Sequence, residues 1–143
     1  MDKKLMLITF FIASAILCRA QVSQPLRTFK QLYVMSAKMS GTESGLVFKL
    51  KTENCDVEVE VIFKDENYHD DDEVSLVRYV APSVKFDYKL IGKLLEQNAP
   101  KSVWRKAWQR DSWYTKDWRL FGSFIYAGDK AALTVWQRDN PKD

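Results

Sequence analysis

A strict alternation of apolar and polar residues runs from Cys55 to Lys64. This period of two is typical of a strand with one buried and one solvated face. Apolar residues also dominate Leu46 to Lys51 and Val74 to Val80, which predicts two further strands. The polar stretch Thr52-Glu53-Asn54 suits a hairpin loop between the first two of these strands. The expected buried face of the alternating strand is formed by Val57, Val59, Val61 and Phe63.

The second half of the chain combines helix and strand patterns. A helix is predicted from Ser83, which can cap it, to about Asn98, and Ala99-Pro100 would end it. A shorter helix is predicted from Ser102 to about Arg110. The segments Trp118 to Ala127 and Lys130 to Gln137 predict a hairpin.

The order of these elements predicts the fold class. We expect one α+β domain over residues 21–143, with an antiparallel sheet of about five to six strands packed against one or two helices. Thr28 to Lys38 fits either a strand or a helix. The 123 residues after residue 20 are close to the usual size of one domain, which can bury roughly two-thirds of its unfolded surface.

Residues 1–20 have the layout of a secretory signal peptide. Lys3 and Lys4 precede a 13-residue apolar run, Leu5 to Leu17, and small residues follow. A membrane-spanning helix needs ~18 or more apolar residues, so we expect no stable membrane span after the signal is removed. Cleavage fits after Ala20 or after Ala15. The sequence therefore predicts a secreted or periplasmic protein.

Charge is divided unevenly along the predicted mature chain. Residues 21–81 carry 7 basic and 11 acidic side chains, whereas residues 82–143 carry 12 and 7. The near balance over the whole chain gives no basis for nucleic-acid binding. Only Cys55 remains after residue 20, so no intramolecular disulfide is expected and the core must hold the fold. A lone cysteine fits a buried small apolar residue, while intermolecular pairing stays open.

Aromatic and basic residues are concentrated between Lys101 and Arg119. Four of the five tryptophans lie there, with six basic and two acidic side chains. Tryptophan and arginine dominate protein-interface hot spots, and the same groups can stack on sugar rings or bind anionic polymers. The candidate binding residues are Trp104, Arg105, Trp108, Arg110, Trp113, Trp118 and Arg119.

Each of these tryptophans could instead belong to the core, because burying one ring removes about 150–250 Å² from water. The core interpretation is favoured for Trp104, Trp108 and Trp136, and the two interpretations are balanced for Trp113 and Trp118. The predicted function is an exported, non-catalytic, protein-binding inhibitor or immunity-type factor. The alternative is a glycan- or polyanion-binding module that uses the same segment.

Metal binding and catalysis have weaker support. Asp70, Asp72 and Glu73 could offer oxygen ligands to Ca²⁺, but the loop has no glycine and a solvated loop is favoured. His69 is the only histidine, and an extended strand would separate it from Cys55 by tens of ångströms. No nucleophile, dinucleotide or phosphate-loop motif occurs. We expect no metal and no cofactor, and a small hydrolase with a carboxylate pair stays open as a third hypothesis.

Overall fold

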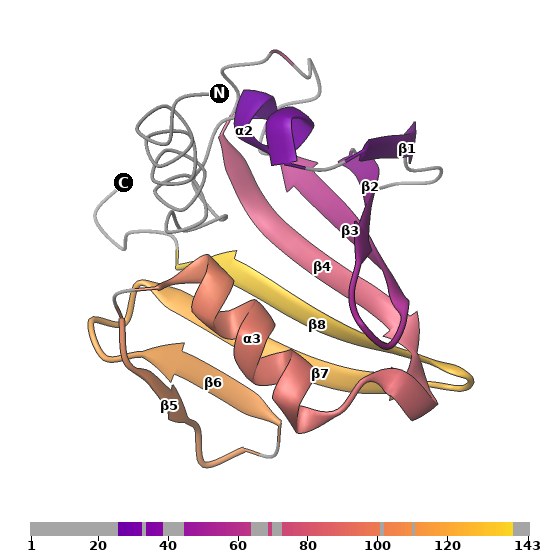
Figure 1. Cartoon of the computed structure of the whole chain (residues 1–143). Coiled ribbons are helices and arrows are strands. Elements are labelled where there is room, and N and C mark those ends of the chain that lie inside the picture. Colours follow the sequence, from indigo (N-terminus) through magenta and orange to yellow (C-terminus); the bar gives the residue numbers. More distant parts are fainter. Residues whose placement is uncertain are drawn as a thin grey trace, which may run out of the picture.

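The computed structural model describes residues 26–32, 34–38, 45–63, 69, 73–100, 102–109 and 111–138. Its helical elements are α2 (Leu26–Leu32), the 3₁₀ turn η1 (Ser83–Lys85) and α3 (Tyr88–Asn98). Its strands are β1 (Val34–Lys38), β2 (Gly45–Lys51), β3 (Asp56–Phe63), β4 (Val74–Pro82), β5 (Trp104–Lys106), β6 (Ser112–Thr115), β7 (Leu120–Ala127) and β8 (Lys130–Gln137). In the described residues these strands form one antiparallel sheet in the order β1-β2-β3-β4-β8-β7-β6-β5 (Figure 1).

The elements fall into two units with the same order, a helix followed by a four-stranded meander. The N-terminal unit (residues 26–82) contains α2 and β1 to β4, and the C-terminal unit (residues 83–138) contains α3 and β5 to β8. Strands β4 and β8 pair along seven register partners, from Leu76↔Trp136 to Pro82↔Lys130. The two meanders are therefore parts of one continuous sheet.

One face of the sheet, here called the inner face, carries the core. The alternation in β3 places Val57, Val59 and Val61 there, each fully buried. Register partners in an antiparallel sheet point to the same side. Val59 is paired with Tyr79 and Tyr79 with Leu133, and all three are fully buried. The core thus continues across the boundary between the two units.

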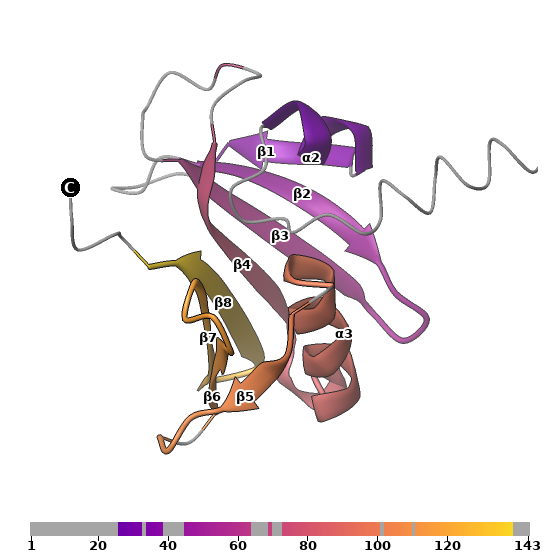
Figure 2. The same ribbon diagram turned by 90° about the vertical axis from the view of Figure 1, so that its left-hand side faces the viewer.

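Both helices pack on the inner face (Figure 2). The ring of Phe29 in α2 lies 6.1 Å from that of Phe48 in β2. In α3, Leu95 sits over Gly122, where an added Cβ would lie only 2.9 Å from Leu95 Cδ2. The absence of a side chain at Gly122 therefore lets the helix approach β7 closely.

The structure confirms the predicted antiparallel sheet but is richer in strand than the predicted α+β arrangement. The strands predicted at Leu46–Lys51 and Val74–Val80 are found as β2 and β4, the strand predicted from Cys55 is found as β3 (Asp56–Phe63), and the predicted C-terminal hairpin is formed by β7 and β8. Thr28–Lys38 combines both alternatives, because α2 ends at Leu32 and β1 begins at Val34. The expected five to six strands are fewer than the eight found in the described part of the chain.

The helix predicted from Ser102 to Arg110 is wrong. Trp104 begins β5 and is paired with Thr115 in β6, and its ring packs against the core. Burial of the indole beneath α3 outweighs the modest helix propensity of this segment.

The predicted cap at Ser83 is also wrong. Ser83 begins the 3₁₀ turn, and α3 starts five residues later. Its cap is Asp87, whose side chain accepts a 2.8 Å hydrogen bond from the backbone N–H of Leu90. Asp87 satisfies one of the free N–H groups at the helix start. The predicted end near Asn98 is confirmed.

None of the described helices is long and apolar enough to cross a membrane. Among the described residues, Cys55 is a free, half-buried thiol at the loop between β2 and β3. Thr52 Oγ1 donates a 2.7 Å hydrogen bond to the carbonyl of Cys55 and accepts one of 3.2 Å from its N–H. The side chain of Thr52 therefore fixes the geometry of this loop. Residues 1–25, which include the predicted signal peptide, lie outside the described residues.

Candidate binding surface

The turn between β6 and β7 holds an aromatic residue in an unusual backbone conformation. Trp118 has φ of 60°, and its N–H donates a 2.8 Å hydrogen bond to the carbonyl of Thr115. A bulky residue in the left-handed region is a true outlier and costs roughly 1–2 kcal/mol. Glycine would avoid this cost, but it would lack the ring by which Trp118 contacts Tyr114 and Phe121.

Side-chain hydrogen bonds build the rest of this turn. Thr115 Oγ1 donates to Asp117 Oδ1 at 2.6 Å and accepts from the N–H of Leu120 at 3.1 Å. Asp117 Oδ1 also accepts from the N–H of Arg119 at 3.2 Å. The hydroxyl of Thr115, followed by the N–H and charge of Arg119, holds the pKa of Asp117 below its usual 3.8. The turn is thus fixed from both sides of Trp118.

Four aromatic rings meet where this turn reaches the sheet. The ring of Trp118 stacks on Tyr114 at 4.2 Å with an interplanar angle of 16°, and lies 6.3 Å from Phe121. Phe121 in turn stacks on Trp136 at 5.9 Å. We call Tyr114, Trp118, Phe121 and Trp136 the outer aromatic cluster. Trp118 is 52% exposed and the other three are partly exposed.

The cluster lies on the outer face of the sheet, opposite the helices, and the strand register explains why. Tyr114 is paired with Phe121, Phe121 with Trp136, and Trp136 with Leu76. Leu76 is paired in turn with Ile62 on β3, and Arg105 on β5 extends the row from its other end. Six adjacent strands therefore place one row of mostly apolar side chains on the outer face. In the described residues no helix covers that face.

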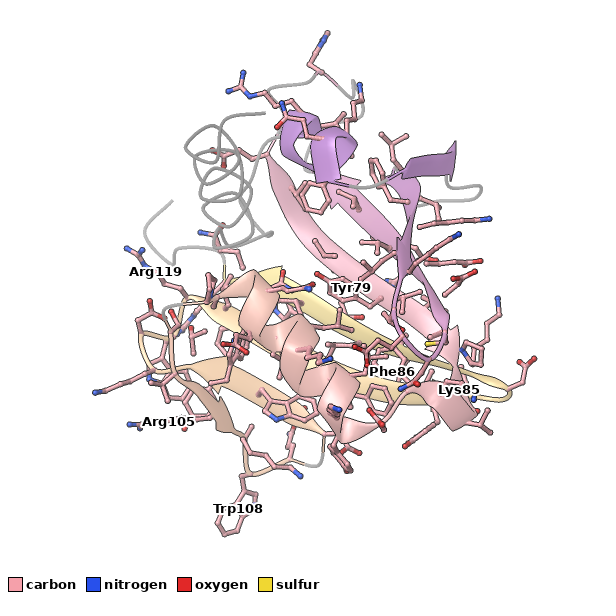
Figure 3. The ribbon with its side chains drawn as sticks, in the orientation of Figure 1. Tyr79, Lys85, Phe86, Arg105, Trp108 and Arg119 are labelled. Carbon is pink, nitrogen blue, oxygen red and sulfur yellow. The ribbon has the colours of Figure 1, made fainter. Side chains whose placement is uncertain are left out.

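Basic side chains border the cluster. Arg105 is exposed at one end of the row, and Arg119 follows Trp118 in the turn, its side chain 80% exposed. Figure 3 shows both arginines extending away from α3. Arg119 Nε lies 4.0 Å from Asp117 Oδ2, an exposed pair that contributes little to stability. Both arginine side chains are therefore exposed at the border of the cluster.

The structure divides the binding residues predicted from the sequence into three groups. Arg105, Trp118 and Arg119 lie at the outer aromatic cluster. Trp104 and Trp113 lie on the inner face and pack against the core, as favoured for Trp104. Trp104 is additionally 3.8 Å from the Cβ position of Gly122.

The third group is the β5–β6 loop. Trp108 was expected to be core, and this is wrong, because its side chain is fully exposed and points away from the fold (Figure 3). The loop itself is tied to α3, since the hydroxyl of Tyr88 donates a 3.1 Å hydrogen bond to Asp111 Oδ1. That bond and the charge of Asp111 raise the pKa of Tyr88 above 10.0. Arg110 lies outside the described residues.

Sequence reasoning did not select Tyr114 or Phe121, and Trp136 was assigned to the core. A signal was available at the β7–β8 hairpin, which has two turn residues, Gly128 (φ 66°) and Asp129. Such a short turn fixes the register, and counting back from it pairs Phe121 with Trp136. Two large aromatic residues facing each other on one side of a hairpin would have indicated a shared surface.

The structure does not bring the metal-ligand candidates Asp70, Asp72 and Glu73, or His69, together in a described site. Asp70 and Asp72 lie outside the described residues, and Glu73 and His69 are exposed. Among the described residues no group of three or more histidine, cysteine or acidic side chains could hold a metal ion. Cys55 precedes β3 and His69 follows it, so the two lie beyond opposite ends of that strand.

The division of charge coincides with the division of structure. The acidic segment ends at residue 81, and the N-terminal unit ends with β4 at Pro82.

Comparison with known protein families, with curated proteins and with solved structures found no match to this chain. The geometry of the surface is therefore the basis for assigning a function.

Proposed function

We propose that this chain is an exported, non-catalytic binding protein whose partner docks on the outer aromatic cluster. The observation that carries the proposal is the half-exposed stack of Tyr114, Trp118, Phe121 and Trp136 on the face that the helices leave free. Aromatic anchors with an arginine border are the usual centre of a protein–protein interface.

The backbone of Trp118 adds support. A residue held at φ of 60° costs stability, and the surrounding hydrogen bonds hold it there. Its ring is nevertheless about half exposed, so burial recovers only part of that cost. A functional contact of the exposed indole with a partner explains why tryptophan occupies this position.

The extent of the row favours a protein partner. Its six strands span about 24 Å at the usual spacing of neighbouring strands. A standard interface buries about 800 Å² on each partner, which corresponds to a patch of similar width. The aliphatic side chains of Leu76 and Ile62, both partly exposed, continue the apolar surface beyond the rings. We infer that the protein acts as an inhibitor or immunity-type factor that covers a site on its partner.

Glycan recognition is the second candidate, favoured by a specific observation. The next row of register partners on the outer face is polar, with Ser123 facing Thr134, and Thr134 facing Arg78. Aromatic planes beside hydroxyl groups are suited to stack on sugar rings and hydrogen-bond their substituents. Arg78 is itself held by Glu60 at 2.9 Å, so its guanidinium position is fixed.

The first test is capture of a partner by the wild-type chain and by two tryptophan variants. Trp118→Ala removes the centre of the cluster, and Trp108→Ala removes an exposed tryptophan far from it. We expect a stoichiometric partner from extracellular or periplasmic extract that is lost with Trp118→Ala and kept with Trp108→Ala, with folding checked by circular dichroism. Equal retention by both variants would exclude the cluster as the docking surface.

The glycan alternative is separated by titration. Stacking of an oligosaccharide on Trp118 should change tryptophan fluorescence in the wild type and in Trp108→Ala, but not in Trp118→Ala. A polyanion such as heparin should bind with an affinity that falls steeply with salt. A protein partner predicts neither response. Export is tested by the N-terminal sequence of the mature protein, for which the proposal expects a start after Ala20 or Ala15.

A further inference from the structure

A second surface feature lies away from the outer aromatic cluster, where the two units meet on the helix side. The β2–β3 loop, η1 and α3 together line an open pocket of about 260 Å³. Figure 3 shows Lys85 where this loop descends beside η1, with Phe86 next to it. Three of its lining residues, Leu50, Leu90 and Leu94, are apolar and buried or half-buried, and we call them the leucine floor. The full lining is Leu50, Lys51, Thr52, Glu53, Asn54, Lys85, Asp87, Lys89, Leu90, Lys93, Leu94 and Gln97.

Lysine dominates the charge of this lining. Lys51 comes from β2, whereas Lys85, Lys89 and Lys93 follow one another at intervals of four along η1 and α3. Within the part of the chain that the structure describes, none of the four forms an ion pair. Glu53 and Asp87 are the acids of the lining, and the side chain of Asp87 already caps α3. The pocket therefore has an excess of two positive charges.

This placement of lysine works against the stability of α3. The N-terminal end of a helix carries a partial positive charge that favours acids, yet the first turn of α3 contains no acid and does contain Lys89. Lys89 and Lys93 are four residues apart, a spacing at which like charges repel on a helix. A bound anion would remove both penalties, because it would screen the lysines and accept hydrogen bonds from them.

The type of cation indicates the type of anion. The guanidinium of arginine matches carboxylate and phosphate alike through two parallel hydrogen bonds, whereas the ammonium of lysine acts as a point charge. Attraction to point charges grows with the charge of the anion, so a cluster of lysines favours a doubly charged phosphate over a singly charged carboxylate. All four cations here are lysines. The volume is slightly below that of pockets for drug-sized ligands, and the apolar floor of Leu50, Leu90 and Leu94 can accept a small non-polar group.

We propose that this lysine pocket binds a small organic phosphate monoester, with the phosphate among Lys51, Lys85, Lys89 and Lys93 and its organic group on the leucine floor. The site is separate from the outer aromatic cluster, and it draws residues from both units. Its occupation would tie the β2–β3 loop of the N-terminal unit to α3 of the C-terminal unit.

The test uses phenyl phosphate as the probe, followed by the backbone amide signals of the full-length mature chain in NMR titrations. We expect saturable shifts in α3 and the β2–β3 loop at concentrations up to about 10 mM, the range of a weak charge-assisted site. The double variant Lys89→Gln/Lys93→Gln should weaken binding by about tenfold or more. The matched control Lys116→Gln/Lys130→Gln, with the same change in net charge outside the pocket, should bind like the wild type.

Two further probes fix the ligand class. Inorganic phosphate should bind at the same residues but more weakly, because it lacks a group for the leucine floor. Benzoate, with the same ring and a carboxylate, should bind at least several-fold more weakly than phenyl phosphate. The proposal is overturned if no saturable shifts occur, if both double variants weaken binding equally, or if benzoate binds as tightly as phenyl phosphate.

Discussion

The N-terminal and C-terminal units share the same order of helix and strands but present different outer faces. On β2 and β3 the outer face carries charged side chains, including Lys49, Glu58 and Glu60. On β6, β7 and β8 it carries Tyr114, Phe121 and Trp136 in register. The inner faces, by contrast, are alike in being apolar and covered by a helix. Stability constrains the inner face of both units, whereas the outer face is free to differ and does so.

The two units also differ in net charge. The acidic N-terminal unit and the basic C-terminal unit meet at the β4–β8 pair, and the salt bridge Arg78–Glu60 lies beside that boundary. An uneven distribution of charge between the two units would orient an approaching partner before contact is made. We therefore expect the N-terminal unit to influence the rate of association and the C-terminal unit to set its strength.

The largest predicted effect compares an inner-face ring with an outer-face ring. Phe48→Ala removes a fully buried side chain and should lower the free energy of unfolding by about 3–5 kcal/mol. Phe121→Ala removes a partly exposed ring of the cluster and should cost clearly less, about 1–2 kcal/mol. Urea unfolding at neutral pH measures both. Equal losses would show that the outer aromatic cluster is a second core and not a binding surface.

The next prediction tests how far the binding surface extends from the C-terminal unit onto the N-terminal unit. Leu76→Ser interrupts the apolar row where it passes onto β4, and should weaken partner binding by about tenfold, a moderate hot-spot effect. Glu58→Ala, on the charged outer face of β3, should change the dissociation constant by less than about twofold. Calorimetric titration with the captured partner distinguishes the two. A larger effect of Glu58→Ala would move the surface onto the N-terminal unit.

A smaller effect is predicted for a hydrogen bond that joins the units. Asn98 Nδ2 in α3 donates to Tyr79 Oη in β4 at 2.8 Å, and both side chains are fully buried. Tyr79→Phe should cost at least about 1 kcal/mol, because a buried donor loses its acceptor. A double-mutant cycle with Asn98→Ala should give a coupling energy of the same order. Additive losses would show that the two units do not communicate through this bond.

The smallest effect concerns the pH dependence of the β6–β7 turn. Because the pKa of Asp117 is lowered in the folded chain, its ionised form stabilises the turn at pH values above its usual 3.8. This stabilisation is lost as the pH falls through the lowered pKa. Trp118 fluorescence should therefore change below pH 3.8, and Asp117→Asn should remove that transition while leaving global unfolding nearly unchanged. An identical transition in the variant would assign it to another group.

The comparison also explains how much could be read from the sequence. In β3 apolar and polar residues alternate over most of the strand, so the alternation of Val57, Val59 and Val61 predicted β3 and its buried side correctly. In the C-terminal unit β7 and β8 carry large apolar residues on both faces. Alternation cannot assign Phe121 or Trp136 to a side when both sides carry such residues.

The segment from Lys101 to Arg119 shows most clearly which features local sequence patterns cannot predict. Trp104 and Trp108 are four residues apart, which suggested a shared helical face, but Trp104 lies in a strand beneath α3 and Trp108 in an exposed loop. Packing of Trp104 beside Gly122 and Leu95 depends on elements far along the chain. The left-handed backbone of Trp118 has no local sequence signature, since glycine is the residue expected there. These contacts are tertiary, and local patterns do not encode them.

The pairing of β4 with β8 has a consequence for self-association. An N-terminal unit on its own would expose the nine-residue edge of β4, most of which is apolar, and such an edge readily pairs with other chains. In the C-terminal unit β8 pairs with seven of these nine residues, Leu76 to Pro82. The two strands left at the ends of the described sheet, β1 and β5, have five and three residues. The C-terminal unit therefore protects the chain from aggregation, in addition to carrying the aromatic rings, because the edges that remain are too short to recruit a further strand efficiently.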